Sequence, residues 1–123
     1  MGAEHTVQGV RHDLEMQVFH TPKKTNGNVT AAAIAIHFSA DRFNVEVSQA
    51  QEFIIDEFFD SLKWDNTGNN VRSPYIYFGD LMMMLNMKDR WAYRGSMTTP
   101  PCDWGVYWNV LKSVNPIKQK HLD

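Results

Sequence analysis

The chain has 123 residues, a net charge of −2, 43% hydrophobic residues and 21% charged residues. This balance is typical of one folded globular domain, and the slight acidity gives no electrostatic reason to expect nucleic acid as a partner. The longest apolar runs, such as residues 31–36, are too short to cross a bilayer, so we expect no direct membrane span. Cys102 is the only cysteine, which excludes a disulfide framework within the chain.

The first predicted element is a half-buried strand over residues 10–20, because its side chains alternate between two sets. One face carries Leu14, Met16, Val18 and His20, and the other carries Asp13, Glu15, Gln17 and Phe19. A cluster of turn-forming residues at 21–28 follows this strand. Residues 31–38 then read as a second strand, buried on both faces.

The clearest helix is predicted to begin at Ser48, which can form a capping box with Gln51. We expect its apolar stripe to comprise Ala50, Phe53, Ile54, Phe58 and Leu62, with Glu52, Asp56, Glu57 and Asp60 facing water. Short aromatic segments at 75–78, 91–93 and 105–111 read as further strands. The order of elements predicts a mainly β (α+β) fold, with a sheet and a peripheral helix.

Two stretches of the sequence resemble the α-class, eukaryotic-type carbonic anhydrases. Residues 3–9 and 14–20 are similar to the family's S-E-H-T-V loop and E-L-H-L-V-H strand. Residues 93–102 are similar to its Y-x-G-S-L-T-T-P-P-C loop, and a tryptophan follows at position 108, as it does in the family. The two stretches occur in the family's order, so the resemblance covers essentially the whole chain.

This resemblance implies a fold and an extent. The expected architecture is the central, twisted and mostly antiparallel sheet of the α-carbonic anhydrase fold, incomplete in this chain. Residues 1–123 would form a single partial domain, which lacks the strand with the family's His-x-His pattern and the C-terminal portion. An isolated part of one core would leave apolar strand faces uncovered, so we expect the chain alone to be aggregated or molten.

The resemblance also implies where zinc binds in active family members. They hold the ion with three histidines, and the position of the third histidine is occupied here by Gln17. A carboxamide oxygen is a much poorer zinc ligand than an imidazole nitrogen. We therefore predict no metal ligand and no cofactor in this chain. Glu15, whose family counterpart orients that histidine, is expected to accept a hydrogen bond from Gln17 instead.

The five histidines are interpreted as structural or surface residues. His12 and His20 are expected on one face of one strand, roughly 26 Å apart at about 3.3 Å per residue, which is too far to chelate one ion. His5 and His20 match histidines of the family's loop and core, while His37 and His121 have no partner at a ligand-like spacing.

Other positions match the family's catalytic surroundings. Thr98 and Glu4 match the pair that orients the zinc-bound hydroxide; a buried Thr–Glu hydrogen bond would also serve the fold alone. The carbon dioxide pocket is matched by Phe19, Ala33, Met97, Thr99 and Trp108. Cys102 is either a free buried thiol or a disulfide partner for another chain. The Met82–Met84 run suggests a contact region in a surface loop.

Two functions remain open. The first is a carbonic-anhydrase-like protein without a complete zinc site, a non-catalytic structural or binding component whose domain is completed by another polypeptide or a large assembly. The alternative is an active zinc carbonate dehydratase, which converts carbon dioxide and water to bicarbonate and a proton. It would need the missing ligands from another segment or chain.

Overall fold

The computed structural model describes residues 2–24, 27, 29–42, 48–63 and 75–123. The chain divides into two compact units, one of residues 1–37 and 86–114, the other of residues 38–85 and 115–123. None of the helices in the described ranges is long and apolar enough to span a membrane.

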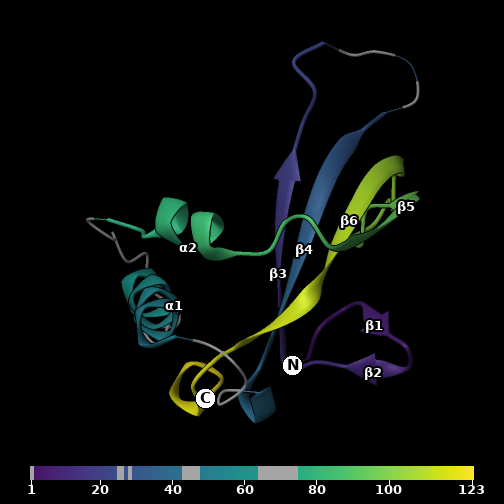
Figure 1. The fold of residues 1–123 in the computed structure, drawn as a ribbon. Coiled ribbons are helices and arrows are strands. Elements are labelled where there is room, and N and C mark those ends of the chain that lie inside the picture. Colours follow the sequence, from purple (N-terminus) through teal and green to yellow (C-terminus); the bar gives the residue numbers. More distant parts are fainter. Residues whose placement is uncertain (1, 25–26, 28, 43–47, 64–74) are drawn as a thin grey trace. The chain divides into compact units, whose positions relative to one another are not determined.

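The main element is a four-stranded sheet in the order β3-β4-β6-β5 (Figure 1). Its strands are β3 (Leu14–His20), β4 (Ala31–Ser39), β5 (Arg90–Ser96) and β6 (Trp104–Pro116). β5 runs antiparallel to β6, with Trp91 opposite Val110 and Tyr93 opposite Trp108. A small hairpin joins β1 (Thr6–Val7) to β2 (Val10–Arg11). The predicted mainly β class is confirmed, and so are the strands predicted over 31–38, 91–93 and 105–111. The single strand predicted over 10–20 is interrupted: residues 10–11 belong to the short strand β2, and β3 begins only at Leu14.

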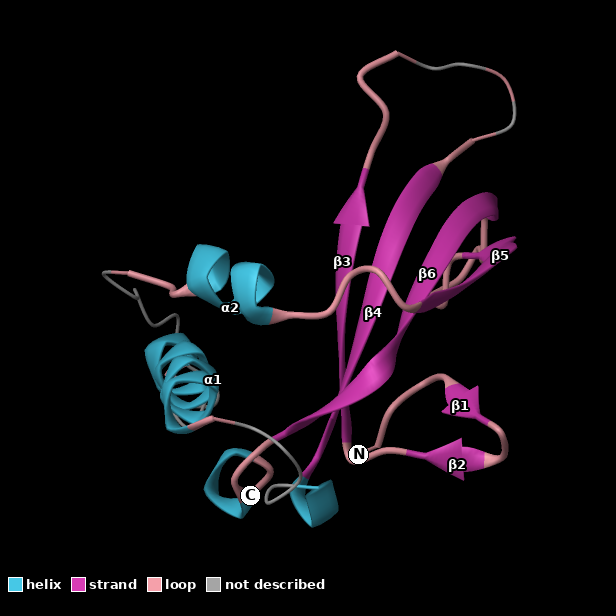
Figure 2. Cartoon of the chain, in the orientation of Figure 1, coloured by secondary structure: helices cyan, strands magenta, loops and turns pink. Residues whose placement is uncertain are grey.

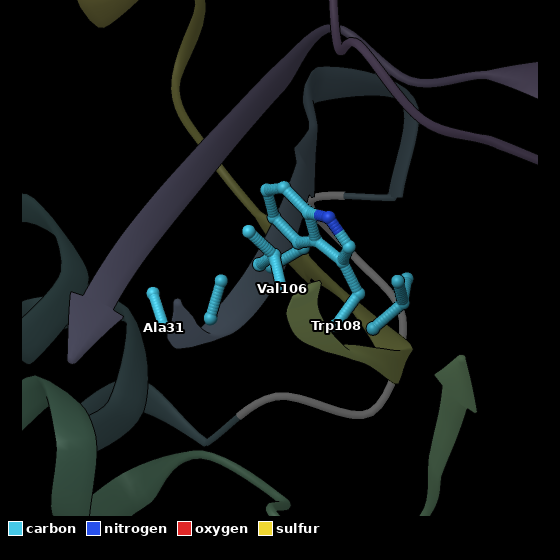
Figure 3. Packing of buried hydrophobic residues seen from close by; sticks show 6 residues of the cluster. Ala31, Val106 and Trp108 are labelled. Atoms are coloured by element: carbon cyan, nitrogen blue, oxygen red, sulfur yellow. The ribbon is translucent and has the colours of Figure 1, made fainter. Parts of the chain in front are cut away.

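The core of the first unit contains small side chains from β4 packed against larger ones from β6. Its buried members are Ala31, Ala33, Ala35, Val106, Trp108 and Val110, three of which are labelled in Figure 3. Gly95 of β5 is buried, and a Cβ atom there would come within 3.1 Å of the Trp108 ring and 2.9 Å of the Tyr93 ring. The alanines and this glycine therefore make room for Trp108 at the centre of the sheet.

The second unit contains all the helical segments that the structure describes, drawn in cyan in Figure 2. They are η1 (Ala40–Arg42), α1 (Gln49–Leu62), α2 (Phe78–Met84) and η2 (Gln119–His121). The predicted capping box is present, because Ser48 Oγ accepts from Gln51 N and the Gln51 side chain accepts from Ser48 N. Two orphan amide groups at the start of α1 are thereby satisfied.

The buried face of α1 differs from the predicted stripe. Ile55, Phe58 and Phe59 are buried, and Phe59 packs edge-to-face on Phe38 with ring centres 5.0 Å apart. Phe53, predicted to face the core, is 64% exposed. The apolar residues of α1 cover more than half of its circumference, so periodicity alone did not identify which stripe is packed.

Asp56 of α1 also departs from the prediction, because it does not simply face water. Its carboxylate pairs with the ammonium of Lys118 and lies 3.1 Å from Nε2 of His121. Although partial burial acts to raise the pKa of Asp56, the hydrogen bonds from Lys118 and His121 outweigh it and lower that pKa. The C-terminal segment is thus attached to α1 by a charge cluster.

The strand predicted over residues 75–78 is wrong, since Phe78 begins helix α2. Leu81 and Leu85, four residues apart, are both buried, and α2 contacts α1. A local aromatic cluster resembled a strand, but packing on α1 favours the helical spacing. The methionine run belongs to this helix rather than to a surface loop, although Met83 is 88% exposed.

We predict that Phe59→Ala lowers the free energy of unfolding by about 3–5 kcal/mol, because it leaves a cavity in the core. Phe53→Ala removes the same atoms from an exposed site of the same helix and should change it by less than about 0.5 kcal/mol. Urea unfolding of the chain, in the assembly in which it is isolated, measures both values. Equal effects of the two substitutions would contradict the observed orientation of α1.

Candidate functional site: a buried carboxylate hub

The polar centre of the first unit is the carboxylate of Glu15, on β3, whose side chain is only 2% exposed. The loop before β1 brings His5 to it: the backbone N–H of His5 donates to Oε1 at 2.9 Å, and Nδ1 lies 2.9 Å from Oε2. From β4, Nε2 of the fully buried His37 lies 3.0 Å from Oε1. One carboxylate thus connects a loop and two strands.

Glu15, His5 and His37 form a hydrogen-bonded hub, and His5 extends it to β5. Because an ionised carboxylate can only accept hydrogen bonds, His5 Nδ1 carries the proton that is donated to Glu15. In the neutral ring, Nε2 is then the acceptor for the hydroxyl of Tyr93, 2.5 Å away. The His5 ring also packs edge-on against Trp108, with ring centres 4.8 Å apart. A carboxylate–imidazole–phenol chain therefore links β3 to β5.

The environment keeps Glu15 ionised. Burial acts to raise the pKa of its carboxyl group, but hydrogen bonds from His37, His5 and Gln17 outweigh burial and hold that pKa far below the ordinary value of 4.5. The pKa of Tyr93 is raised by burial and by the negative charge of Glu15. The phenol is thus held in its protonated form, able to donate to His5.

Gln17 lies between two carboxylates. Its side-chain nitrogen donates to Glu4 Oε2 at 2.8 Å and also to Glu15 Oε2. A carboxamide nitrogen has two hydrogens, so both can be used in this way, leaving the Oε1 oxygen as the only donor atom for a metal. The hydrogen bond expected from Gln17 to Glu15 is present, and the second one, to Glu4, was not expected.

Among the described residues, the side chain of Gln17 is poorly suited to hold zinc. Zinc favours imidazole or thiolate ligands at a closed or nearly closed tetrahedral site, and the carboxamide oxygen of Gln17 is a weak substitute. Within the described part of the chain, His, Cys, Asp and Glu side chains form no group of three that is arranged to hold a metal ion.

The predicted pocket residues separate into two groups. Ala33 and Met97 pack with Trp108 in the core cluster, and Phe19 lies edge-to-face on Trp108 with ring centres 5.4 Å apart. Thr98 and Thr99 are exposed in the turn that follows β5. Glu4 accepts its hydrogen bond from Gln17. The pairing of Thr98 with Glu4 therefore stays a prediction.

Cys102 is exposed, so the expectation of a buried thiol is wrong. It lies in the turn after Pro101, with a positive φ of 58°, and its N–H donates to the Thr99 carbonyl at 2.8 Å. This tight turn directs the residue outward rather than into the sheet.

Sequence reasoning missed the role of His37. The spacing of the histidines predicts no partner for His37, yet its Nε2 contacts Glu15, and the centre of the His12 ring lies 5.2 Å from the centre of its ring. A signal was available: an imidazole inside a strand that is buried on both faces must find a hydrogen-bond partner. The distance predicted between His12 and His20 assumed that both lie on one strand. His12 precedes β3, so the two histidines do not share a strand.

A cavity of about 310 Å³ adjoins the hub. Its lining combines residues of the loop and hairpin with residues of β5 and β6: His5, Thr6, Val7, Gln8, Trp91, Tyr93 and Val110. His5 and Tyr93 belong to both the hub and the cavity wall. The polar chain from Glu15 therefore ends at a largely apolar hollow.

Comparisons with known proteins agree on one family. The model of the eukaryotic-type carbonic anhydrases matches residues 1–123. Carbonic anhydrase 3 of Sus scrofa is 30% identical over 118 residues, and the Homo sapiens protein is 32% identical; the match covers 90% of this chain and 42% of each relative. The α-carbonic anhydrase of Thermovibrio ammonificans, solved with the inhibitor sulfanilamide, aligns with a TM-score of 0.71 and 25% identity. That alignment covers 98% of this chain and 47% of the other, so the chain spans less than half of these relatives.

We predict that Glu15→Gln lowers the free energy of unfolding at pH 7 by about 1–3 kcal/mol. The N–H groups that now donate to the carboxylate would face an uncharged amide, whose NH₂ group cannot accept hydrogen bonds. Since the folded pKa of Glu15 lies below its unfolded value, its contribution is present above about pH 4.5 and is lost as the pH falls through the folded pKa. The variant should therefore lose less stability on acidification than the unchanged protein.

The control is Asp103→Asn, which neutralises an exposed carboxylate and should leave the pH dependence nearly unchanged. Denaturant unfolding between pH 3 and pH 8 measures all three proteins. A Glu15→Gln protein as stable as the unchanged one at pH 7 would show that the hub contributes nothing to the fold.

Proposed function

The chain belongs to the eukaryotic-type carbonic anhydrase family, and from this premise we propose that it is a member without a complete zinc site. In this proposal it acts as a non-catalytic structural or binding component of a larger assembly. The observation that carries the proposal is the position of Gln17, whose amide nitrogen donates to both Glu4 and Glu15.

The chemistry of this position supports the loss of catalysis. Hydration of carbon dioxide in the family depends on a zinc ion that supplies a bound hydroxide near neutral pH. An amide nitrogen that carries two hydrogens has no lone pair to give to a metal, and its hydrogen bonds orient it toward the two carboxylates. Glu4 and Glu15 thus have donors without any metal in place.

The hydrogen bonds of the hub stabilise the fold even without a metal. Hydrogen bonds to a buried charged group contribute about 1.5–3 kcal/mol each, and removal of one partner leaves the charge unsatisfied. Glu15 accepts from the loop before β1, from β4 and from Gln17 on its own strand. The fold therefore explains why a glutamate occupies position 15. This role does not require a zinc-binding histidine for Glu15 to orient.

The proposed partner is suggested by how much of the family domain this chain matches. Relatives with more than twice this length form the family's domain, and this chain matches 42% of carbonic anhydrase 3. We propose that another polypeptide, or neighbours in a large assembly, cover the strand faces and edges that remain. Unpaired strand edges otherwise favour uncontrolled association.

One observation favours the alternative, an active carbonate dehydratase that receives its missing ligands from another segment or chain. The family positions of the hydroxide-orienting pair are still Glu4 and Thr98, and Glu15 is still the acceptor on β3. In that case either the Gln17 side-chain oxygen binds zinc, or other residues bind zinc without Gln17. Metal content separates the two functions more sharply than activity does.

We predict that the chain, purified in its native assembly without chelators, contains far less than one zinc ion per chain by elemental mass spectrometry. Gln17→His in the chain alone should add no carbon dioxide hydration activity, because a catalytic zinc needs two further protein ligands. Gln17→Leu, which removes the amide donors, should lower stability without changing metal content. One zinc per chain bound at Gln17, together with hydration activity, would overturn the non-catalytic function.

A further inference from the structure

The cavity beside the hub opens next to an unprotected part of the sheet. β5 is an outer strand of the four-stranded sheet in the described part of the chain. Two of its aromatic side chains, Trp91 and Tyr93, line the cavity and are 46% and 44% exposed. Val7 and Val110 complete its apolar wall. Outer strands with large exposed aromatics are sites where another chain adds to a sheet.

The cavity suits a side chain rather than a large ligand. Its volume of about 310 Å³ is at the lower limit of small-molecule sites and accommodates one large aromatic group. Trp91 and Tyr93 offer ring faces to such a group. The Tyr93 hydroxyl donates to His5 and keeps a lone pair, so it can also accept a hydrogen bond from a polar ring atom.

Charge decides against a second copy of this chain as the occupant. β5 carries Arg90 and Arg94, and the ammonium of Lys112 lies 4.0 Å from the centre of the Trp91 ring. One acidic residue, Asp89, directly precedes the strand. Pairing β5 with another β5 would place these arginines near one another, which is destabilising, whereas an acidic segment complements them.

We propose that the outer edge of β5 and the adjoining cavity form the docking surface for the polypeptide that completes this domain. The occupant is an extended acidic segment that pairs with β5 and places one large aromatic side chain in the cavity. This inference rests on the partner in the proposed function, and on the more than half of the relatives' length that this chain does not match.

The test is hydroxyl-radical footprinting of the chain co-expressed with a defined probe. The probe is the portions of Sus scrofa carbonic anhydrase 3 that lie outside its 118 matched residues, expressed as separate segments. Trp104 and Tyr107, which are 67% and 44% exposed outside the cavity, serve as internal references in the same sample. In the complex we expect Trp91 and Tyr93 to be labelled at least about fivefold more slowly than these references, because an interface covers them.

A pair of matched variants removes the dependence on labelling chemistry. Trp91→Ser should weaken capture of the probe by about tenfold or more, as removal of a central aromatic at an interface does. Trp104→Ser removes an exposed tryptophan elsewhere on the same sheet and should leave capture unchanged.

Two results would overturn the docking surface: no complex with the probe, or a complex in which Trp104 is protected and Trp91 is not. Zinc content, measured on the same complex, is a separate readout. A zinc ion bound at Gln17 would refute the proposed non-catalytic function, whereas the footprint would still report where the partner lies.

Discussion

The Glu15 carboxylate is placed among donors that come from different parts of the chain. A loop supplies His5, β4 supplies His37, and Gln17 lies two residues away on the same strand. A buried carboxylate with fewer donors would be protonated or would be excluded from the core. The geometry of the first unit, including the position of Tyr93 on β5, depends on satisfying this one charge.

The need to satisfy the Glu15 charge explains why a hydrogen-bond donor occupies position 17. If the position held an apolar residue, Glu4 and Glu15 would lose a shared donor and lie near one another as like charges. A carboxamide supplies two hydrogens and no charge, so it separates the carboxylates by hydrogen bonding to both. A glutamine at this position therefore lets the polar cluster satisfy its own hydrogen bonds.

The sequence predicted most of the strands, because alternation over β3 and the apolar run of β4 are local signals. The family was predicted from the resemblance of two stretches to known motifs. The start of α1 was predictable from a local signal as well, since a capping box is encoded by Ser48 and Gln51 alone. What it did not predict depends on tertiary contacts. The buried face of α1 is selected by Phe38, and helix α2 by its packing on α1.

The same distinction applies to the site. The bond from Gln17 to Glu15 joins neighbours on one strand face, so it could be expected from spacing alone. The contacts of His5 with Tyr93 and of His37 with Glu15 join residues 88 and 22 positions apart, and no local pattern pairs them. A buried histidine signals that a partner exists but not which residue it is.

We propose that Gln17 acts as a hydrogen-bond donor to two carboxylates rather than as a metal ligand. The most direct measurement is the NMR signal of its side-chain NH₂ group, recorded on the native assembly before and after addition of zinc. We predict two slowly exchanging protons whose chemical shifts do not respond to zinc and change in the Glu15→Gln variant. A Gln17 amide that exchanges freely, or that shifts with one equivalent of zinc, would contradict it.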